Sequence, residues 1–243
     1  NMVVSVVGDF DPATVLDALH VEFGTLPAGE SVFNQPVPEA RGPKIRMRRG
    51  AMPEGYVSCF FRSPSLRSEK LPALQLVADV LVGGPHSRLF RRLRERESLV
   101  YDVTGNLELT PEFGTLDIVV PTKKRNLFRV LKAVLEEIDS LRNNSLSEEE
   151  LALWRTSLIK RGLLGFDDVT GAAAWYAEAE LLASGRNSDD FSGWIEKLNR
   201  VGKAEFDSVA SEIFSPENSF IYLVGALWPW QERTAMRLVR NIG

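Results

Sequence analysis

The chain has 243 residues, of which 44% are hydrophobic and 26% are charged, as is usual for a globular protein. Its net charge of −4 gives no electrostatic indication that it binds nucleic acid or an anionic membrane. No apolar run reaches the roughly 18 residues that a membrane-spanning helix needs, and the single cysteine, Cys59, excludes an internal disulfide.

The two ends of the sequence carry the same short element. Residues 1–12 (NMVVSVVGDFDP) and 218–229 (NSFIYLVGALWP) align without a gap, with Asn, Gly and Pro at the same places. In each copy an apolar run predicts a buried strand, Gly8 or Gly225 ends it, and a helix follows the proline. Asp11 is suited to cap the first of these helices. The repeat suggests a unit of roughly 210 residues that occurs twice in a longer protein, with chance similarity of two strand–turn–helix segments as the alternative.

The predicted domain organisation follows from this repeat. Residues 1–27 are interpreted as the closing strand and helix of a preceding homologous unit. Residues 28–43 are rich in proline and glycine and are interpreted as a linker, so that residues 44–243 form the second unit. This unit is expected to open with two strands. They precede a mostly buried helix over residues 70–82, which a Gly-Gly-Pro sequence ends.

The order of the later elements indicates the fold class. The next predicted elements are a short charged helix over 87–98, paired strands over 101–109 and 114–120, and an amphipathic helix over 124–142. A capping box, with Ser147 as the cap and Glu150 three residues later, opens a run of further helices. Hairpins imply antiparallel pairing, and grouped helices imply one covered face. The predicted class is therefore α+β, with a mainly antiparallel sheet covered on one face by helices.

The residue patterns of common catalytic and cofactor sites are missing. The single Gly in VVGDFDP does not make a dinucleotide fingerprint. His20 and His86 are 66 positions apart, so the chain contains neither H-E-x-x-H nor H-x-x-E-H. We interpret His20 as an exposed helix residue and His86 as a loop residue. Asp167 and Asp168 lack further spaced oxygen ligands and are interpreted as a helix start. We therefore expect neither a metal nor a cofactor in this chain.

One segment, GGPHSRLFRRLRERESLVYDV at residues 83–103, carries a more specific signal. It resembles the second half of the pitrilysin/insulinase-type zinc metallopeptidases, the inverzincins, and especially their bacterial and mitochondrial processing peptidase branch. Those halves have a Gly-rich turn, Ser-Arg-Leu-Phe, then Leu-Arg-Glu, and a Tyr seven residues after that Arg. Residues 87–90, residues 93–95 and Tyr101 match this pattern. Ser98 departs from it, because the family often has Gly there, and we do not expect that difference to decide function.

The resemblance implies a tandem duplication of one α+β unit, with the metallohydrolase fold that LuxS shares with the mitochondrial processing peptidases. In that family the first unit carries H-x-x-E-H and a further Glu, which bind zinc and activate water. The second unit lacks zinc and faces the first across a closed chamber. Its Tyr, here Tyr101, would donate to the oxyanion, and its Arg, here Arg94, would bind a substrate carbonyl. The helix that corresponds to the zinc helix has Gln75 and Asp79 here, and no His.

The resemblance therefore predicts the substrate-binding C-terminal half of a bipartite zinc metalloendopeptidase, inactive by itself. Zinc is expected in the homologous N-terminal half or in a partner subunit, and the substrate would be a peptide or an unfolded polypeptide. A homo-oligomer is a further expected assembly, whereas nucleic acid and membranes are not expected partners. The alternative is a non-proteolytic structural or interaction module of the same fold. An H-x-x-E-H motif in the preceding half would favour the enzyme.

The residues of the candidate site also allow a reading without any function. RRLRERE at residues 91–97 is compatible with a solvated helix face, since charged helix faces are common. Tyr101 alternates in phase with Val103, Leu107 and Leu109, which is compatible with a core aromatic residue at the head of a strand.

Overall fold

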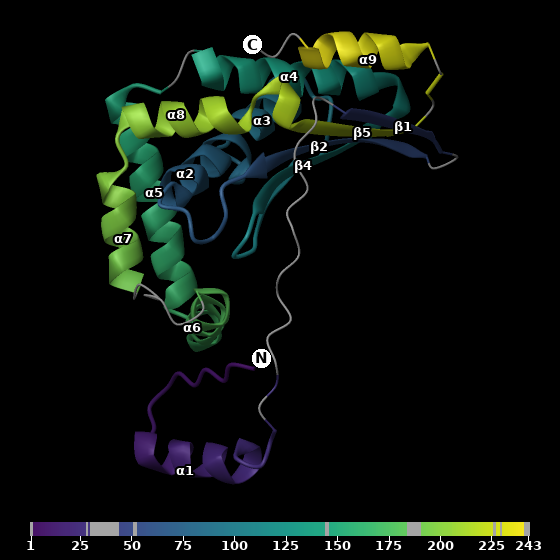
Figure 1. Ribbon diagram of the computed structural model, residues 1–243. Coiled ribbons are helices and arrows are strands. Elements are labelled where there is room, and N and C mark those ends of the chain that lie inside the picture. The colour runs from purple at the N-terminus through teal and green to yellow at the C-terminus, as the bar shows by residue number, and fades with distance from the viewer. Residues whose placement is uncertain are drawn as a thin grey trace.

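The computed structural model describes residues 2–27, 29, 44–50, 53–143, 146–183, 191–225, 227–228 and 230–240. The strands in these ranges are β1 Lys44–Arg49, β2 Glu54–Ser63, β3 Thr104–Leu109, β4 Gly114–Lys123 and β5 Ser219–Gly225. They form one sheet with the order β1-β5-β2-β4-β3 (Figure 1). Only β1 and β5 pair in parallel, and the other neighbours are antiparallel. The predicted α+β class with a mainly antiparallel sheet is confirmed.

The helices of the described residues follow the predicted order. They are α1 Pro12–Phe23, α2 Leu71–Val82, α3 Arg88–Phe90, the π-helix η1 Arg91–Arg96, the 3₁₀ turn η2 Lys124–Asn126, α4 Leu127–Asn143, α5 Glu148–Phe166, α6 Val169–Ala183, α7 Phe191–Arg200, α8 Lys203–Ile213, the 3₁₀ turn η3 Pro216–Asn218 and α9 Gln231–Arg240. The predicted capping box is confirmed, since the Ser147 N–H donates to Glu150 Oε2 at 2.9 Å and the Glu150 N–H donates to Ser147 Oγ at 3.2 Å. None of the described helices has the length and apolar character that crossing a bilayer requires.

The core lies between the sheet and the helices that pack on it, which are α2, α4, α8 and α9. Apolar residues alternate along the strands, so that side chains such as Phe61 and Ile118 point into this core. Cys59 is fully buried in the central strand β2, and burial raises the pKa of its thiol to about 12. The other face, hereafter the open face, has no helix packed on it in Figure 1. Tyr56, Phe60 and Tyr222 lie half-buried on the open face.

The first 27 residues do not contribute to this core. Asp11 caps α1 as predicted, because its carboxylate accepts from the N–H groups of Ala13 and Thr14. The predicted strand over residues 3–7 is not formed, and no described strand pairs with residues 2–7. No residue of α1 is buried, and Figure 1 shows this helix apart from the sheet and its helices. The assignment of residues 1–27 to a preceding unit stays a prediction.

The two copies of the terminal repeat share one unusual backbone conformation. Gly8 has a φ of 155° and Gly225 a φ of 157°, values that residues with a side chain rarely adopt. A helix follows each glycine, as predicted: α1 begins at Pro12 and α9 at Gln231. The two segments share this glycine conformation and the helix that follows, but only the second apolar run forms a buried strand, β5. The predicted linker, residues 28–43, lies outside the described residues except for Gly29.

We expect Gly105→Ala to lower the free energy of unfolding by about 1–3 kcal/mol, since overpacking a core has that effect. Gly105 lies on β3 directly against α2, and an added Cβ would overlap the Val82 side chain. Urea unfolding should also show coupling between the two positions. The double variant Gly105→Ala/Val82→Ala should lose less stability than the sum of the single variants. Additive losses would mean that the Gly105 contact does not limit the packing.

Candidate functional site

Gln75 and Asp79, the α2 residues at the place of the zinc ligands in the related half, bind other side chains of this chain. Gln75 Oε1 accepts a hydrogen bond from the Trp194 indole N–H at 2.9 Å. Asp79, which is 7% exposed, forms an ion pair with Arg161. Burial raises the pKa of Asp79, and the hydrogen bond from Arg161 opposes that rise. The described residues contain no group of three or more His, Cys, Asp or Glu side chains that could hold a metal. This donor set does not fit zinc.

The other candidate ligands are also where the sequence places them. His20 is exposed on α1, and His86 is exposed in the turn before α3. Asp167 and Asp168 lie between α5 and α6, and Asp168 Oδ2 accepts from the Gly171 N–H at 3.2 Å. This bond is typical of a helix start and confirms the interpretation for Asp168, whereas Asp167 is the C-terminal cap of α5.

Arg94 and Tyr101 are brought together by the structure. The Arg94 guanidinium carbon lies 4.6 Å from the centroid of the Tyr101 ring and 5.0 Å from that of Phe90. Such cation–π contacts contribute about 0.5–1 kcal/mol at exposed sites. Tyr101 is 80% exposed, so the interpretation as a core aromatic residue is wrong. The predicted strand over 101–109 also begins later, at Thr104. The Tyr101 hydroxyl is therefore presented to solvent beside a cation.

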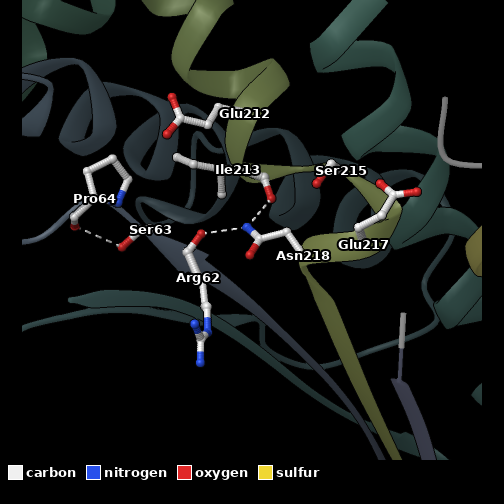
Figure 2. Close-up of a pocket in the computed structure, with 8 residues that line it drawn as sticks. All are labelled: Arg62, Ser63, Pro64, Glu212, Ile213, Ser215, Glu217 and Asn218. Atoms are coloured by element: carbon white, nitrogen blue, oxygen red, sulfur yellow. Dashed lines mark hydrogen bonds between the residues drawn. The ribbon is translucent and has the colours of Figure 1, made fainter. Parts of the chain in front are cut away.

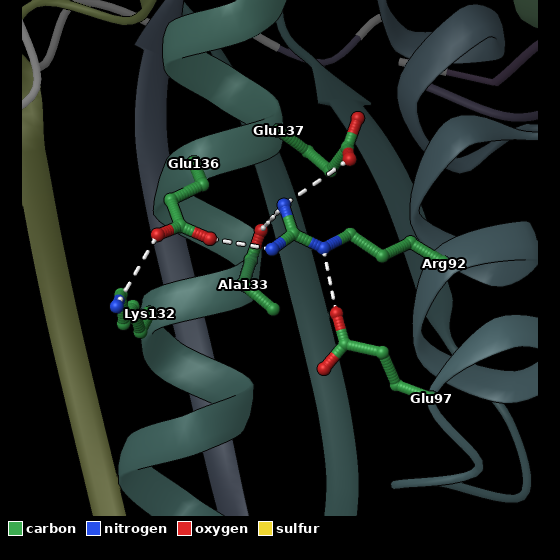
Figure 3. A network of polar contacts seen from close by, with 6 residues as sticks. All are labelled: Arg92, Glu97, Lys132, Ala133, Glu136 and Glu137. Atoms are coloured by element: carbon green, nitrogen blue, oxygen red, sulfur yellow. Dashed lines mark hydrogen bonds and ion pairs between the residues drawn. The ribbon is translucent and has the colours of Figure 1, made fainter.

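Arg92 ties the π-helix η1 to α4 (Figure 3). Its Nε donates to Glu97 at 2.8 Å, and its Nη1 donates to Glu137 at 3.2 Å and to the Ala133 carbonyl at 3.3 Å. Its Nη2 binds Glu136, which also pairs with Lys132. These carboxylates raise the pKa of Arg92 even though partial burial opposes the charged form. Arg92 therefore clamps this helix to α4, whereas Arg91, Glu95 and Arg96 are exposed. The interpretation as a solvated face holds for those three residues and not for Arg92.

Two further contacts fix the chain between η1 and Tyr101. The Leu99 N–H donates to the Leu93 carbonyl at 2.8 Å and closes the end of the π-helix. The Thr122 hydroxyl donates to the Leu99 carbonyl at 2.9 Å, which holds this segment against the end of β4. Ser98, between them, has a φ of 49° in the left-handed region. A glycine adopts this conformation without strain, which gives a physical reason for the glycine that the resemblance predicts at this position.

We expect Ser98→Gly to raise the free energy of unfolding by about 0.5–1 kcal/mol. The left-handed conformation strains a residue with a Cβ by about 1–2 kcal/mol, and the greater freedom of glycine in the unfolded chain offsets part of that gain. Denaturant unfolding of Ser98→Gly beside Ser98→Ala tests this, since the alanine variant keeps the strain. Equal stability of the two variants would show that Ser98 is not strained.

A pocket lies at the opposite end of the sheet from Tyr101, where β2 ends and β5 begins (Figure 2). Asn218 bridges it, donating to the carbonyls of Arg62 at 2.7 Å and Ile213 at 2.8 Å. Glu212 at its rim pairs with Lys70 at 2.5 Å. The side-chain amide hydrogens of Asn218 are thus used to join β2 to the end of α8. We interpret this pocket as a structural joint.

The comparison with known families decides the relationship. The family model described as the peptidase M16 inactive domain matches residues 1–158. The chain belongs to this M16 family. An uncharacterized zinc protease of Mycobacterium tuberculosis is 24% identical over 223 residues, which cover 88% of this chain and 50% of that protein. The probable inactive metalloprotease YmfF of Bacillus subtilis is 23% identical over 197 residues, covering 80% of this chain and 46% of its own length.

Solved structures agree with the M16 assignment at the level of the fold. An M16 inactive domain from Pseudomonas fluorescens superposes with a TM-score of 0.80 at 15% identity, covering 91% of this chain and 52% of that one. The chain spans about half the length of the curated relatives that it matches. The predicted kinship with the second, zinc-free half of these peptidases is therefore confirmed, whereas the closer resemblance to the processing peptidase branch stays a prediction.

Sequence reasoning missed the residues that hold the M16 candidate pair in place. Arg92 was not singled out, because its partners Glu136 and Glu137 lie 44 and 45 positions away. The partners of Gln75 and Asp79 lie still further along the chain, at Trp194 and Arg161. The charged run at residues 91–97 was the only indication of these contacts in the sequence. It did not show that Arg92 is the arginine that faces α4.

Proposed function

We propose that this chain is the substrate-binding, zinc-free half of a two-half M16 metalloendopeptidase. The observation that carries the proposal is the contact between half-buried Arg94, on the clamped π-helix, and exposed Tyr101, in the segment that follows it. Both residues match the pattern that the resemblance predicts. π-Helical turns occur frequently at functional sites. The homologous half would supply the zinc, and this chain would supply a cation and a phenol hydroxyl to the bound peptide.

The open face of the sheet supports the same proposal. Its centre is aromatic, with Phe60 and Phe220 in contact at a ring separation of 5.8 Å. A sheet face with half-buried aromatic residues and no covering helix is suited to face another unit across a chamber. Residues 1–27 support it too, because their exposed apolar side chains need a neighbour such as the closing sheet of the preceding unit.

Arg94→Ala tests the substrate-binding role in this chain combined with its zinc-bearing half. A contact with a substrate carbonyl exists in the ground state and in the transition state alike, so its loss should raise KM at least as much as it lowers kcat. Peptide hydrolysis measured over a range of substrate concentrations gives both constants. Arg96→Ala, a change of an exposed arginine on the same helix, is the matched control. Unchanged kcat and KM in Arg94→Ala would remove Arg94 from the site.

A second candidate is a structural or interaction module without proteolysis. It is favoured by one observation, the description of the related YmfF as a probable inactive metalloprotease. The two candidates differ in the other half of the protein. Peptide hydrolysis by the combined halves that disappears when the histidines of H-x-x-E-H are replaced would support the peptidase. A homologous half without that motif would support the interaction module.

A further inference from the structure

The outermost strand β1 carries an unbalanced row of positive charge. It pairs only with β5, and no described strand lies on its other side. Lys44, Arg46 and Arg48 are exposed and share the open face, because alternate residues of a strand point to the same side. Neighbouring charges in this row are about 7 Å apart along the strand. The residues opposite them on β5 are uncharged: Phe220, Tyr222 and Val224.

This row differs from the paired basic residues of the helices. Basic side chains of the helices, such as Arg92 and Arg161, bind carboxylates within the chain. No ion pair joins Lys44, Arg46 or Arg48 to a described residue. The chain as a whole is net acidic, so the row is a local reversal of sign. Three like charges on one strand repel one another and attract an anionic partner.

We infer that the outer edge of β1, on which no described strand lies, binds an extended peptide segment in which acidic and apolar residues alternate. An added strand would take up the backbone hydrogen-bonding groups on the outer side of β1. Its acidic side chains would lie beside Lys44, Arg46 and Arg48 on the open face. Its apolar side chains would lie on the other face, beside Ile45 and Met47 at the margin of the core. The site goes beyond the proposed function and needs no peptide cleavage.

Charge selects this occupant over two others. A second copy of β1 would place cations opposite cations, which disfavours self-pairing. A polyanion such as a nucleic acid would match the charge but would not form strand hydrogen bonds. Charged edge strands also protect sheets against aggregation, and that role alone would need no partner. An experiment therefore has to separate pairing with an acidic strand from charge attraction and from protection.

The test uses fluorescent hexapeptides and anisotropy at low and moderate salt. The alternating peptide Glu-Val-Glu-Val-Glu-Val should bind at least tenfold more tightly than Glu-Glu-Glu-Val-Val-Val, which has the same composition. Methylating alternate backbone nitrogens of the alternating peptide should abolish its binding, because it removes the strand hydrogen bonds. The triple reversal Lys44→Glu/Arg46→Glu/Arg48→Glu should transfer the preference to Lys-Val-Lys-Val-Lys-Val.

The matched control places the same charge change on α9, whose exposed stripe contains Arg233, Arg237 and Arg240. Reversing these three should leave the alternating peptide bound. The single variant Arg46→Glu, expected to weaken binding severalfold, replaces the triple variant if circular dichroism shows that the latter is unfolded. Equal binding of the alternating, block and methylated peptides, or displacement of all three by inorganic polyphosphate alike, would reduce the site to charge attraction. If none of the peptides binds, the cations of β1 would serve only to protect the sheet edge against aggregation.

Discussion

Tyr101→Phe is expected to lower kcat by roughly 10²- to 10³-fold when this chain is combined with its zinc-bearing half. A donor to the oxygen that becomes negative during attack on the peptide bond contributes about that much. The substitution keeps the ring, and with it the packing against Arg94, whose guanidinium carbon is 4.6 Å from the ring centroid. KM should change little, because the hydroxyl acts mainly in the transition state. Steady-state hydrolysis of a peptide substrate measures both constants.

The matched control for this prediction is Tyr176→Phe. Tyr176 is also exposed, but it belongs to the aromatic cluster around Phe166 and lies outside the candidate site. Its variant should keep the activity of the unchanged chain. A Tyr101→Phe chain that folds normally and retains full kcat would reject the role of the phenol. The Arg94 contact would then be only a local packing interaction.

Arg92→Met is expected to destabilise the chain by about 2–3 kcal/mol and to lower kcat/KM of the combined halves by about tenfold or more. The stability loss follows from removing a half-buried cation that binds Glu97, Glu136 and Glu137, which leaves three carboxylates to repel one another. The loss of activity follows from a looser segment between η1 and Tyr101, since small displacements of catalytic groups greatly reduce rates. Urea unfolding and peptide hydrolysis measure the two effects.

Lys132→Met is the control for Arg92→Met. Its Nζ lies 3.6 Å from Glu136 on an exposed face of α4, and pairs of this kind contribute at most about 0.5 kcal/mol. Amide exchange at Leu99 supplies a readout of position, because that N–H closes the π-helix through its bond to Leu93. Faster exchange should occur in Arg92→Met only. Unchanged exchange together with unchanged activity would show that Arg92 stabilises the fold without positioning the pair.

Local signals in the sequence predicted most of the fold. Asp11 and the pair Ser147 and Glu150 mark helix starts through contacts within one turn, and both caps are confirmed. The buried helix α2 and the order of strands and helices follow from apolar spacing over short windows. The repeat of Gly8 and Gly225 was visible in the sequence, and both glycines have a positive φ, but only the second apolar run forms the predicted strand.

Features that depend on distant partners could not be predicted in this way. The alternation of Lys44, Arg46 and Arg48 with apolar residues can be read from the sequence. The position of β1 at the edge of the sheet cannot, because it depends on parallel pairing with β5, near the other end of the chain. The net charge of −4 for the whole chain gives no indication of this local positive row. The start of β3 was placed too early because the alternation of Tyr101 with Val103 continued the strand pattern. The hydrogen bond from the Thr122 hydroxyl to the Leu99 carbonyl holds the preceding segment at the end of β4, and β3 begins only at Thr104.

The buried thiol of Cys59 can be used to measure how often the sheet opens. Cys59 is the only cysteine in the sequence and lies at 0% exposure in the central strand. With a pKa of about 12, it holds almost no thiolate at neutral pH, so an alkylating reagent reacts with it only when the sheet opens. The rate of labelling therefore measures the population of opened molecules. A second cysteine introduced at an exposed position would be labelled first, which allows a single dye to be attached without removing the native residue.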